Sequence, residues 1–362
     1  MKLVGEDNGH REKTSDLDGV MISVHPSACY DFIVSARALF NPDVYKRAGH
    51  WIAVARNTMA ADLYRQGRPF FEGGETALGL GLLRLIPTLK TDAVPADFIE
   101  LLRSTPAEEC ALMMLDTGET PTEALDFYRS VLNPQDDTPD GFEKKTREFA
   151  GDFADRSLEV LQDPSGSKER ILRFLQRYLE TVFGPSVDSI REAVERAAAS
   201  SKDLLAMQPA VSTVEALTGG YTLSAALRMN QITLAPSVFI YPFMASRVDE
   251  RSGEALIVFG IKNDEILGYR ESGSEDLLDA LKALSNSHRL QILTMLRDGP
   301  LPGPEFIRRL GLSQPTVHHH LAQLRSSGLI RQVRSGEGML YSFRPDAAET
   351  LVRRLQRFLG VD

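Results

Sequence analysis

The chain has 362 residues, of which 43% are hydrophobic and 25% are charged, so its composition is typical of a folded protein and excludes collagen-like and largely disordered chains. A chain of this length usually forms two or three domains. The formal net charge of -9 excludes a polybasic protein that coats nucleic acid or a membrane. Any contact of that kind must therefore be local.

The cysteine count and the first residues indicate a cellular compartment. Cys29 and Cys110 are too few and too far apart in sequence for a disulfide framework or a Cys-x-x-Cys metal site, which favours a reducing cytoplasm. The sequence has no run of about eighteen apolar residues, and residues 1–20 carry acids and bases where a signal peptide needs an apolar segment. We expect a flexible tail over residues 1–20 of a cytoplasmic protein.

Residues 21–270 are predicted to form a mainly helical domain, because apolar residues recur at helical spacing over most of this stretch. A long helix is expected over residues 43–66. Three later helices should each have a proline at their start, where the missing N–H costs nothing: Pro95, Pro106 and Pro121.

The period changes from helical to extended near residues 231–261. Residues 231–243 and 255–261 are rich in β-branched and aromatic side chains and predict a strand pair at the end of the first domain.

A short polar run follows, and the net charge of the chain changes after it. Residues 275–362 contain twelve Lys and Arg against nine Asp and Glu, a net +3, which leaves -12 for the rest of the chain. We therefore expect a second domain over residues 275–362.

The order of elements in this second domain is informative. Gly311 can take the left-handed conformation that ends a helix, and Ser313 can cap the next one. The predicted elements are four helices, two strands and a final helix over residues 276–285, 288–297, 304–310, 314–326, 329–334, 339–344 and 347–359. This is the layout of a winged helix-turn-helix, whose second helix enters the DNA major groove. The fold class is therefore mainly α with a small β component.

The helix over residues 314–326 has two distinct faces. Val317, Leu321 and Leu324 share one face and should pack inward. The other side carries hydrogen-bonding side chains where base edges would lie: Gln314, Thr316, His318, His319 and Gln323. From residue 288 to residue 344, eight arginines oppose three acids. The side chains placed to meet phosphates are Ser313, Arg308, Arg309, Arg325, Arg331, Arg334 and Arg344.

Three segments carry a family resemblance: LSNSHRLQIL at residues 284–293, GLSQPTVHHHL at 311–321 and GLI at 328–330. They resemble ArsR-type winged-helix repressors, and the similarity covers about the last quarter of the chain. The resemblance implies a homodimer, formed by the first and last helices of the module, that binds an inverted-repeat operator on double-stranded DNA and represses transcription until an effector loosens it. The family commonly has Ser where this chain has His318.

Metal binding is not expected. Relatives that sense metals use cysteines at the start of the third helix or histidines on the last helix, and this chain has neither. The run His318–His320 is also a poor chelator, because successive helical residues diverge by about 100°. We expect no metal and no cofactor.

Other patterns have simpler structural interpretations. The glycines near residues 73–81 lack the strand and the third glycine of a phosphate loop, so close helix packing is favoured. Cys29 near His25 lacks an orienting group for catalysis, and no other motif indicates an enzyme. A ligand cage is a weaker interpretation than a core for four aromatic residues: Tyr45, Trp51, Phe70 and Phe71.

The role of the N-terminal domain stays open at this level. It is too large for a dimerisation element and too acidic to widen a DNA footprint, which favours sensing of a small molecule or of a partner protein. The alternatives are an enzyme with a DNA-binding tail and a scaffold that recruits a protein to DNA. A closed apolar cavity favours sensing, whereas a flat exposed apolar patch favours a partner.

Overall fold

The computed structural model describes residues 17, 19–73, 77–118, 120–133, 141–224, 227–267, 275–335 and 338–361. The chain forms two compact units. The N-terminal unit contains residues 21–207 and 231–274. The winged-helix unit contains residues 208–230 and 275–362. Most of residues 1–20, where a flexible tail was expected, lie outside the described residues. Each unit is described by itself.

The N-terminal unit is mainly helical. Its helices are α1 (Ala28–Phe40), α2 (Gly49–Thr58), α3 (Ala61–Phe71), α4 (Pro95–Ser104), α5 (Ala107–Leu115), α6 (Thr122–Leu132), α7 (Phe142–Ala150), α8 (Ala154–Gln162), α9 (Pro164–Tyr178), α10 (Val187–Met207) and α12 (Asp264–Leu267). Proline precedes or begins α4, α5 and α6, as the sequence predicts. The single helix expected over residues 43–66 is wrong, because the backbone is extended at Met59 and Ala60, where Met59 turns into the core.

A four-stranded sheet lies within this unit. It consists of β1 (Met21–Val24), β3 (Gln231–Ser237), β4 (Met244–Asp249) and β5 (Glu254–Gly260), in the order β1-β3-β5-β4. The first three strands are parallel, and β4 runs antiparallel to β5. The strand predicted over residues 231–243 is shorter than expected, because the chain turns after Ser237. The four-residue strand β1 was not expected.

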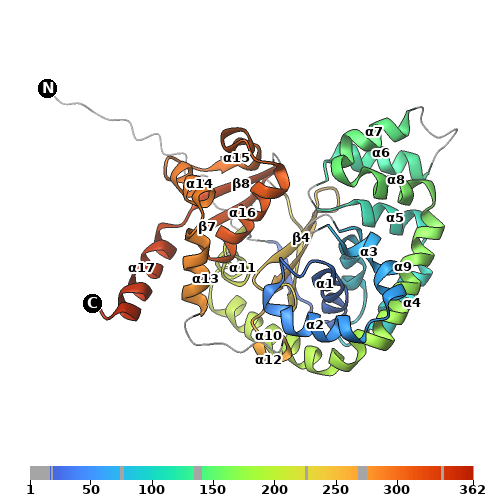
Figure 1. The fold of residues 1–362 in the computed structure, drawn as a ribbon, viewed down its shortest axis with the longest axis horizontal. Coiled ribbons are helices and arrows are strands. Elements are labelled where there is room, and N and C mark those ends of the chain that lie inside the picture. The colour runs from blue at the N-terminus through green and yellow to red at the C-terminus, as the bar shows by residue number, and fades with distance from the viewer. Residues whose placement is uncertain are drawn as a thin grey trace. The chain divides into compact units, whose positions relative to one another are not determined.

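Helix α1 is the centre of the N-terminal unit, since all of its residues are buried (Figure 1). It contacts α2, α3, α4, α10 and β3. Asp31 on α1 accepts hydrogen bonds from Ser237 Oγ (2.6 Å), Val238 N (3.1 Å) and Phe239 N (2.9 Å). Its carboxyl group therefore fixes the loop that follows β3. Burial raises the pKa of Asp31 to about 6, although these hydrogen bonds act in the opposite direction.

Gly81 and the aromatic pattern belong to the packing of this unit, whereas Gly74 lies outside the described residues. Gly81 lies in a 3-10 helix, Leu78–Thr88, where an added Cβ would lie 1.7 Å from the Met113 carbonyl oxygen. Close approach of the backbone therefore requires glycine at this position. The four aromatic residues considered as a ligand cage are part of the hydrophobic core or pack against it: Tyr45, Trp51, Phe70 and Phe71.

The winged-helix unit contains α11 (Ala210–Thr218), β2 (Tyr221–Leu223), α13 (Glu275–Leu284), α14 (Ser287–Arg297), β6 (Leu301–Pro302), α15 (Gly303–Leu310), α16 (Gln314–Ser326), β7 (Ile330–Ser335), β8 (Gly338–Phe343) and α17 (Pro345–Leu359). Its sheet has the order β2-β7-β8-β6, with β7 and β8 forming the wing (Figure 1). None of the described helices in either unit combines the length and the apolar composition needed to cross a bilayer.

The core of the winged-helix unit fixes the orientation of α16. Val317, Leu321 and Leu324 are buried, as the helical spacing predicts, and they pack with Leu296 and Phe306. Gly311 joins α15 to α16 with a positive φ of 66°. This is the left-handed conformation that a tight turn between two helices needs. The opposite face of α16 is consequently directed away from the core.

Residues 208–230 differ from expectation. They were expected in the N-terminal domain, but in the structure they belong to the winged-helix unit. The physical reason is the parallel pairing of β2 with β7, in which Tyr221, Thr222 and Leu223 lie opposite Gln332, Val333 and Arg334. This pairing satisfies an edge of β7 that would otherwise present unpaired backbone groups.

We predict that Asp31 makes the stability of the N-terminal unit depend on pH. The unfolded chain releases this proton near pH 4 and the folded chain near pH 6, so the folded state binds more protons between these values and the free energy of unfolding falls as the pH rises. Relative to the variant Asp31→Asn, the wild type should lose about 3 kcal/mol between about pH 4 and pH 7.

Urea unfolding followed by the fluorescence of Trp51, the only tryptophan, measures this difference within the N-terminal unit. A difference between the two proteins that stays constant with pH would contradict the assignment.

Candidate nucleic-acid interface

The outer face of α16 presents most of the side chains expected to read bases. Gln314, Thr316 and His319 are exposed, and His318 and Gln323 are half-buried. The residues of α16 include no Asp or Glu. This face therefore offers hydrogen-bonding groups without a negative charge that would repel phosphates.

The start of α16 differs from the expected cap. The Ser313 hydroxyl lies 2.8 Å from the Thr316 hydroxyl and makes no capping bond to the backbone of α16. The N–H groups of the first helical turn are consequently not capped by this side chain. Groups of this kind commonly bind phosphate oxygens.

Arg289 links the end of α13 to the middle of α16. This buried side chain donates from Nε to the Ala283 carbonyl (2.5 Å) and from Nη2 to the Lys282 carbonyl (2.6 Å). Its Nη1 donates to Oε1 of Gln323. Burial lowers the pKa of Arg289. The guanidinium thus satisfies carbonyls in the last turn of α13 and fixes one side chain of α16.

This contact determines how Gln323 faces His319. Because Arg289 can only donate, the amide oxygen of Gln323 must face it, and the amide NH₂ must face His319 Nε2 at 2.8 Å. The Nε2 atom is therefore the acceptor, and a neutral His319 carries its proton on Nδ1. Gln323 was expected to contact a base, but its amide oxygen and its amide NH₂ both make hydrogen bonds within the protein.

His320 lies on the core side of α16 and is only 7% exposed. Its pKa is lowered, mainly by burial and then by the nearby positive groups of Arg289, His319 and His288. Within the described part of the chain, no three His, Cys, Asp or Glu side chains gather as a metal site would require. The histidine run thus has one buried neutral ring and one exposed ring, that of His319, on different sides of the helix.

The two arginines of α15 share one acid. Arg308 donates to both oxygens of Glu305 (3.0 and 2.6 Å), and Arg309 donates to one of them (2.6 Å). These hydrogen bonds lower the pKa of Glu305 to about 2. Both arginines remain exposed, so the pair is within reach of solvent.

The expectation that Arg325 contacts phosphate does not fit the structure. This side chain is 4% exposed, and its Nη1 donates to the Thr218 carbonyl at 2.9 Å. Thr218 is the last residue of α11, so its carbonyl has no partner within that helix. The position of Arg325 after α16 suggested a surface role, whereas its contact with α11 buries it.

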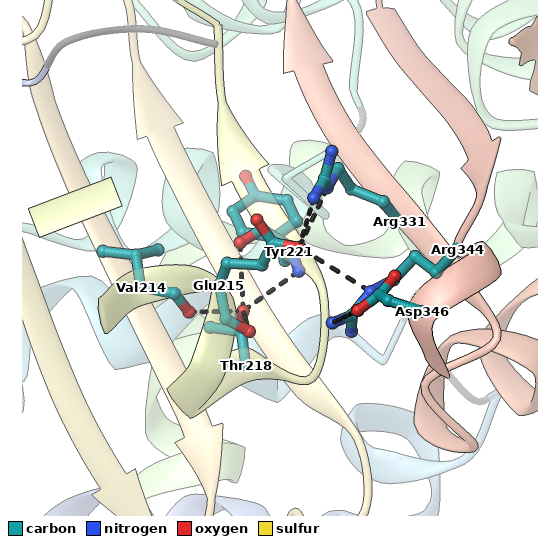
Figure 2. Close-up of polar contacts among 7 residues, drawn as sticks. All are labelled: Val214, Glu215, Thr218, Tyr221, Arg331, Arg344 and Asp346. Atoms are coloured by element: carbon teal, nitrogen blue, oxygen red, sulfur yellow. Dashed lines mark hydrogen bonds and ion pairs between the residues drawn. The ribbon is translucent and has the colours of Figure 1, made fainter. Parts of the chain in front are cut away.

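Three further arginines, in β7 and directly after β8, make contacts within this unit. Arg331 donates to Oε1 of Glu215 from Nε (2.9 Å) and Nη2 (2.8 Å), and Arg344 Nε lies 3.7 Å from the same oxygen (Figure 2). Arg344 also contacts Asp346 at 3.4 Å. Arg334 is half-buried, and its carbonyl accepts from Ser224 N (2.8 Å) beside β2.

Sequence reasoning missed three residues that organise this surface: Glu215, Thr218 and Arg289. A signal for the first two exists, because Gly219 and Gly220 separate a helical pattern from the β-type residues Tyr-Thr-Leu. That pattern predicts a helix followed by a short strand. It does not reveal that the partners lie more than a hundred residues later.

The nucleophile considered at Cys29 is not activated. Burial raises the pKa of the Cys29 thiol to about 11, so it stays protonated at neutral pH. His25 contacts the Tyr30 hydroxyl through Nδ1 (3.2 Å) and the Leu89 carbonyl through Nε2 (3.1 Å). Both groups have structural partners.

Known proteins match the C-terminal part of the chain. The model of the bacterial regulatory protein arsR family matches residues 286–332. The transcriptional activator HlyU of Vibrio cholerae is 36% identical over 87 residues, which are 24% of this chain and 81% of that protein. The HTH-type transcriptional regulator YgaV of Escherichia coli is 34% identical over 91 residues, 25% of this chain and 92% of that protein. The arsenical resistance operon repressor of Staphylococcus aureus is 30% identical over 81 residues, 22% of this chain and 78% of that protein.

The contact of Gln323 with His319 predicts a tautomer. In Gln323→Glu the new carboxylate still accepts from Arg289 but has no N–H, so the proton of a neutral His319 should move from Nδ1 to Nε2. Imidazole ¹⁵N shifts at about pH 8, where an ordinary histidine is neutral, report this change. Gln314→Glu on the same face is the matched control and should leave the His319 tautomer unchanged. A wild-type His319 protonated on Nε2 would refute the contact.

Proposed function

Because this chain belongs, through its C-terminal quarter, to the ArsR family of bacterial transcription regulators, we propose that it is a cytoplasmic, dimeric regulator that binds an inverted-repeat operator in double-stranded DNA. The outer face of α16 carries the proposal. On this face Gln314, Thr316 and His319 are exposed, and α16 contains no Asp or Glu. His319 offers an N–H to a base acceptor, and Gln314 offers an amide that can pair with adenine.

We assign repression rather than activation by family resemblance. Relatives carry both kinds of name, since HlyU is called an activator and the Staphylococcus aureus protein a repressor. In a repressor that its effector releases, the effector weakens operator binding, so DNA and effector favour different states of the protein.

The surface of α17 supports a dimer. An apolar stripe at spacings of three and four residues runs along the second half of this helix: Val352, Leu355 and Leu359. Val352 is 55% exposed and Leu359 61% exposed, and α17 packs against α13. Exposed apolar stripes of this kind commonly mark an interface. We assign its occupant as the same stripe of a second copy, as the family resemblance implies.

We further propose that the N-terminal unit senses a small molecule or a partner protein. Its connection to the DNA-binding surface supports this role, because the chain leaves the N-terminal unit after Met207, contributes α11 and β2 to the winged-helix unit, and returns at Gln231. The crevice lined by residues of α3, α8 and α9 has a volume of only about 10 Å³. That is room for one water molecule, so this crevice does not supply the effector site.

The assignment of the dimer predicts the effect of Val352→Glu. Burying a new carboxylate at an apolar interface is costly, so this variant should elute as a monomer with the chain mass of 40.1 kDa, whereas the wild type should have twice that mass. Arg354→Gln makes the same change in net charge on the same helix and should remain dimeric. Light scattering after gel filtration measures both masses, and a monomeric wild type would contradict the proposal.

The assignment of the DNA-reading face is tested by selection of genome fragments on the purified full-length protein at about 150 mM salt, followed by footprinting. The wild type should enrich a short inverted repeat. The double variant His319→Ala, Gln314→Ala should enrich a different sequence. Arg334→Gln should weaken binding to all sequences and reduce the salt slope by about 1. Identical enrichment by the wild type and the double variant would refute the role given to α16.

A further inference from the structure

The carboxylate of Glu215 lies between Arg331 of β7 and Arg344, which follows β8 at the start of α17. Its Oε1 atom accepts two hydrogen bonds from Arg331, and only the 3.7 Å ion pair joins it to Arg344 (Figure 2). The side chain of Glu215 is 15% exposed, compared with 36% for Arg331. Both arginines belong to the group expected from sequence to bind DNA phosphates.

Arg344 is incompletely satisfied by this arrangement. Its Nε is buried and has no hydrogen-bond partner among the described residues. A carboxylate has two acceptor oxygens, and one of them, Oε1, accepts both hydrogen bonds that Arg331 donates. A phosphate presents more oxygens and pairs well with planar guanidinium groups. The pair Arg331 and Arg344 is therefore better matched to a phosphate than to the carboxylate it holds.

The backbone around Glu215 fixes the carboxylate in place. Thr218 Oγ1 donates to the Val214 carbonyl (2.6 Å) and accepts from Tyr221 N (3.0 Å), which sets the turn between α11 and β2. Gly220 has a φ of 109°, and an added Cβ would lie 3.0 Å from the Ile330 carbonyl oxygen. The Gly220 carbonyl in turn accepts from Gln332 N at 2.8 Å. The turn therefore places β2 beside the edge of β7, and it places Glu215 within reach of Arg331 and Arg344.

The contact of Glu215 with the arginines is also connected to the N-terminal unit through the backbone. The segment that carries Glu215 is joined to the N-terminal unit at both of its ends, after Met207 and before Gln231. A change in the N-terminal unit that shifts either end acts directly on the segment. Conversely, replacing Glu215 by another ligand at Arg331 and Arg344 acts through the same segment on the N-terminal unit, because coupling between two sites is reciprocal.

We propose that Arg331 and Arg344 form a phosphate-binding site that Glu215 occupies in the free protein, so that the segment of residues 208–230 competes with the DNA backbone for the wing. The inference rests on the proposed DNA-binding function and adds the element through which the N-terminal unit controls it. DNA phosphate is the ligand that replaces the carboxylate.

The test is the isosteric variant Glu215→Gln, which removes the charge and keeps the shape of the side chain. Binding of full-length protein to a labelled duplex of random sequence, about 30 base pairs long, is measured by anisotropy over a range of salt. The variant should bind about tenfold more tightly than the wild type at about 100 mM salt, and its salt slope should be steeper by about 1, because one more phosphate is contacted at about 0.9 per contact.

Three matched variants separate competition from a general charge effect. Asp298→Asn removes one negative charge at the exposed end of α14, where the acid forms no ion pair among the described residues, and should change affinity less than twofold. Adding Arg331→Gln and Arg344→Gln to Glu215→Gln should abolish the gain. Glu215→Asp keeps the charge on a shorter side chain and should give an intermediate gain, which keeps the test valid if the amide variant is poorly folded.

Equal or weaker binding by Glu215→Gln, with an unchanged salt slope, would overturn the competition while leaving DNA binding intact. Absence of duplex binding by the wild type and by every variant, even at about 50 mM salt, would overturn the proposed function itself, and the competition with it.

Discussion

The winged-helix unit depends on the pairing of β2 with β7. A wing of two strands leaves one backbone edge unpaired, and such an edge invites pairing with another chain. Here the edge is covered by β2, a strand that precedes β7 by more than a hundred residues. Arg325 fixes the end of α11, just before β2, because it donates a hydrogen bond to the Thr218 carbonyl, 107 residues away in sequence. The DNA-binding module is therefore not an independent appendage. Part of its sheet is made by chain that continues at both ends into the N-terminal unit.

Two buried arginines, Arg289 and Arg325, hold the helices in place on the inner side of this surface. Arg289 joins the last turn of α13 to Gln323, and Gln323 fixes the tautomer of His319. Arg325 joins the end of α16 to the end of α11. The helix proposed for base reading is thus connected by hydrogen bonds both to α13, which packs against α17, and to the segment that enters from the N-terminal unit. Changes at either place have a physical route to the outer face of α16.

The sequence predicts the elements that depend on local signals. The turn at Gly311, the inward face of Val317, Leu321 and Leu324, and the helix starts at prolines all follow from a few neighbouring residues. The short strands β1 and β2 were missed because strands of four and three residues form only with partners far away in sequence. The environment of Arg325 was missed for the same reason, and so was the ion pair of Arg331 with Glu215, which spans 116 residues. A position predicted to lie on the surface does not show whether an arginine is available to bind phosphate or is already hydrogen-bonded to a carbonyl or a carboxylate of the protein.

The most direct measurement is the crystal structure of the full-length protein on a duplex that carries its selected operator. The account predicts two copies related by a two-fold axis, α16 in the major groove, and Arg331 and Arg344 about 3 Å from backbone phosphate oxygens, with the Glu215 carboxylate displaced from Arg331. A complex in which α16 lies in the groove while both arginines remain on Glu215 would contradict the competition. A complex in which α16 does not contact the DNA would contradict the account as a whole.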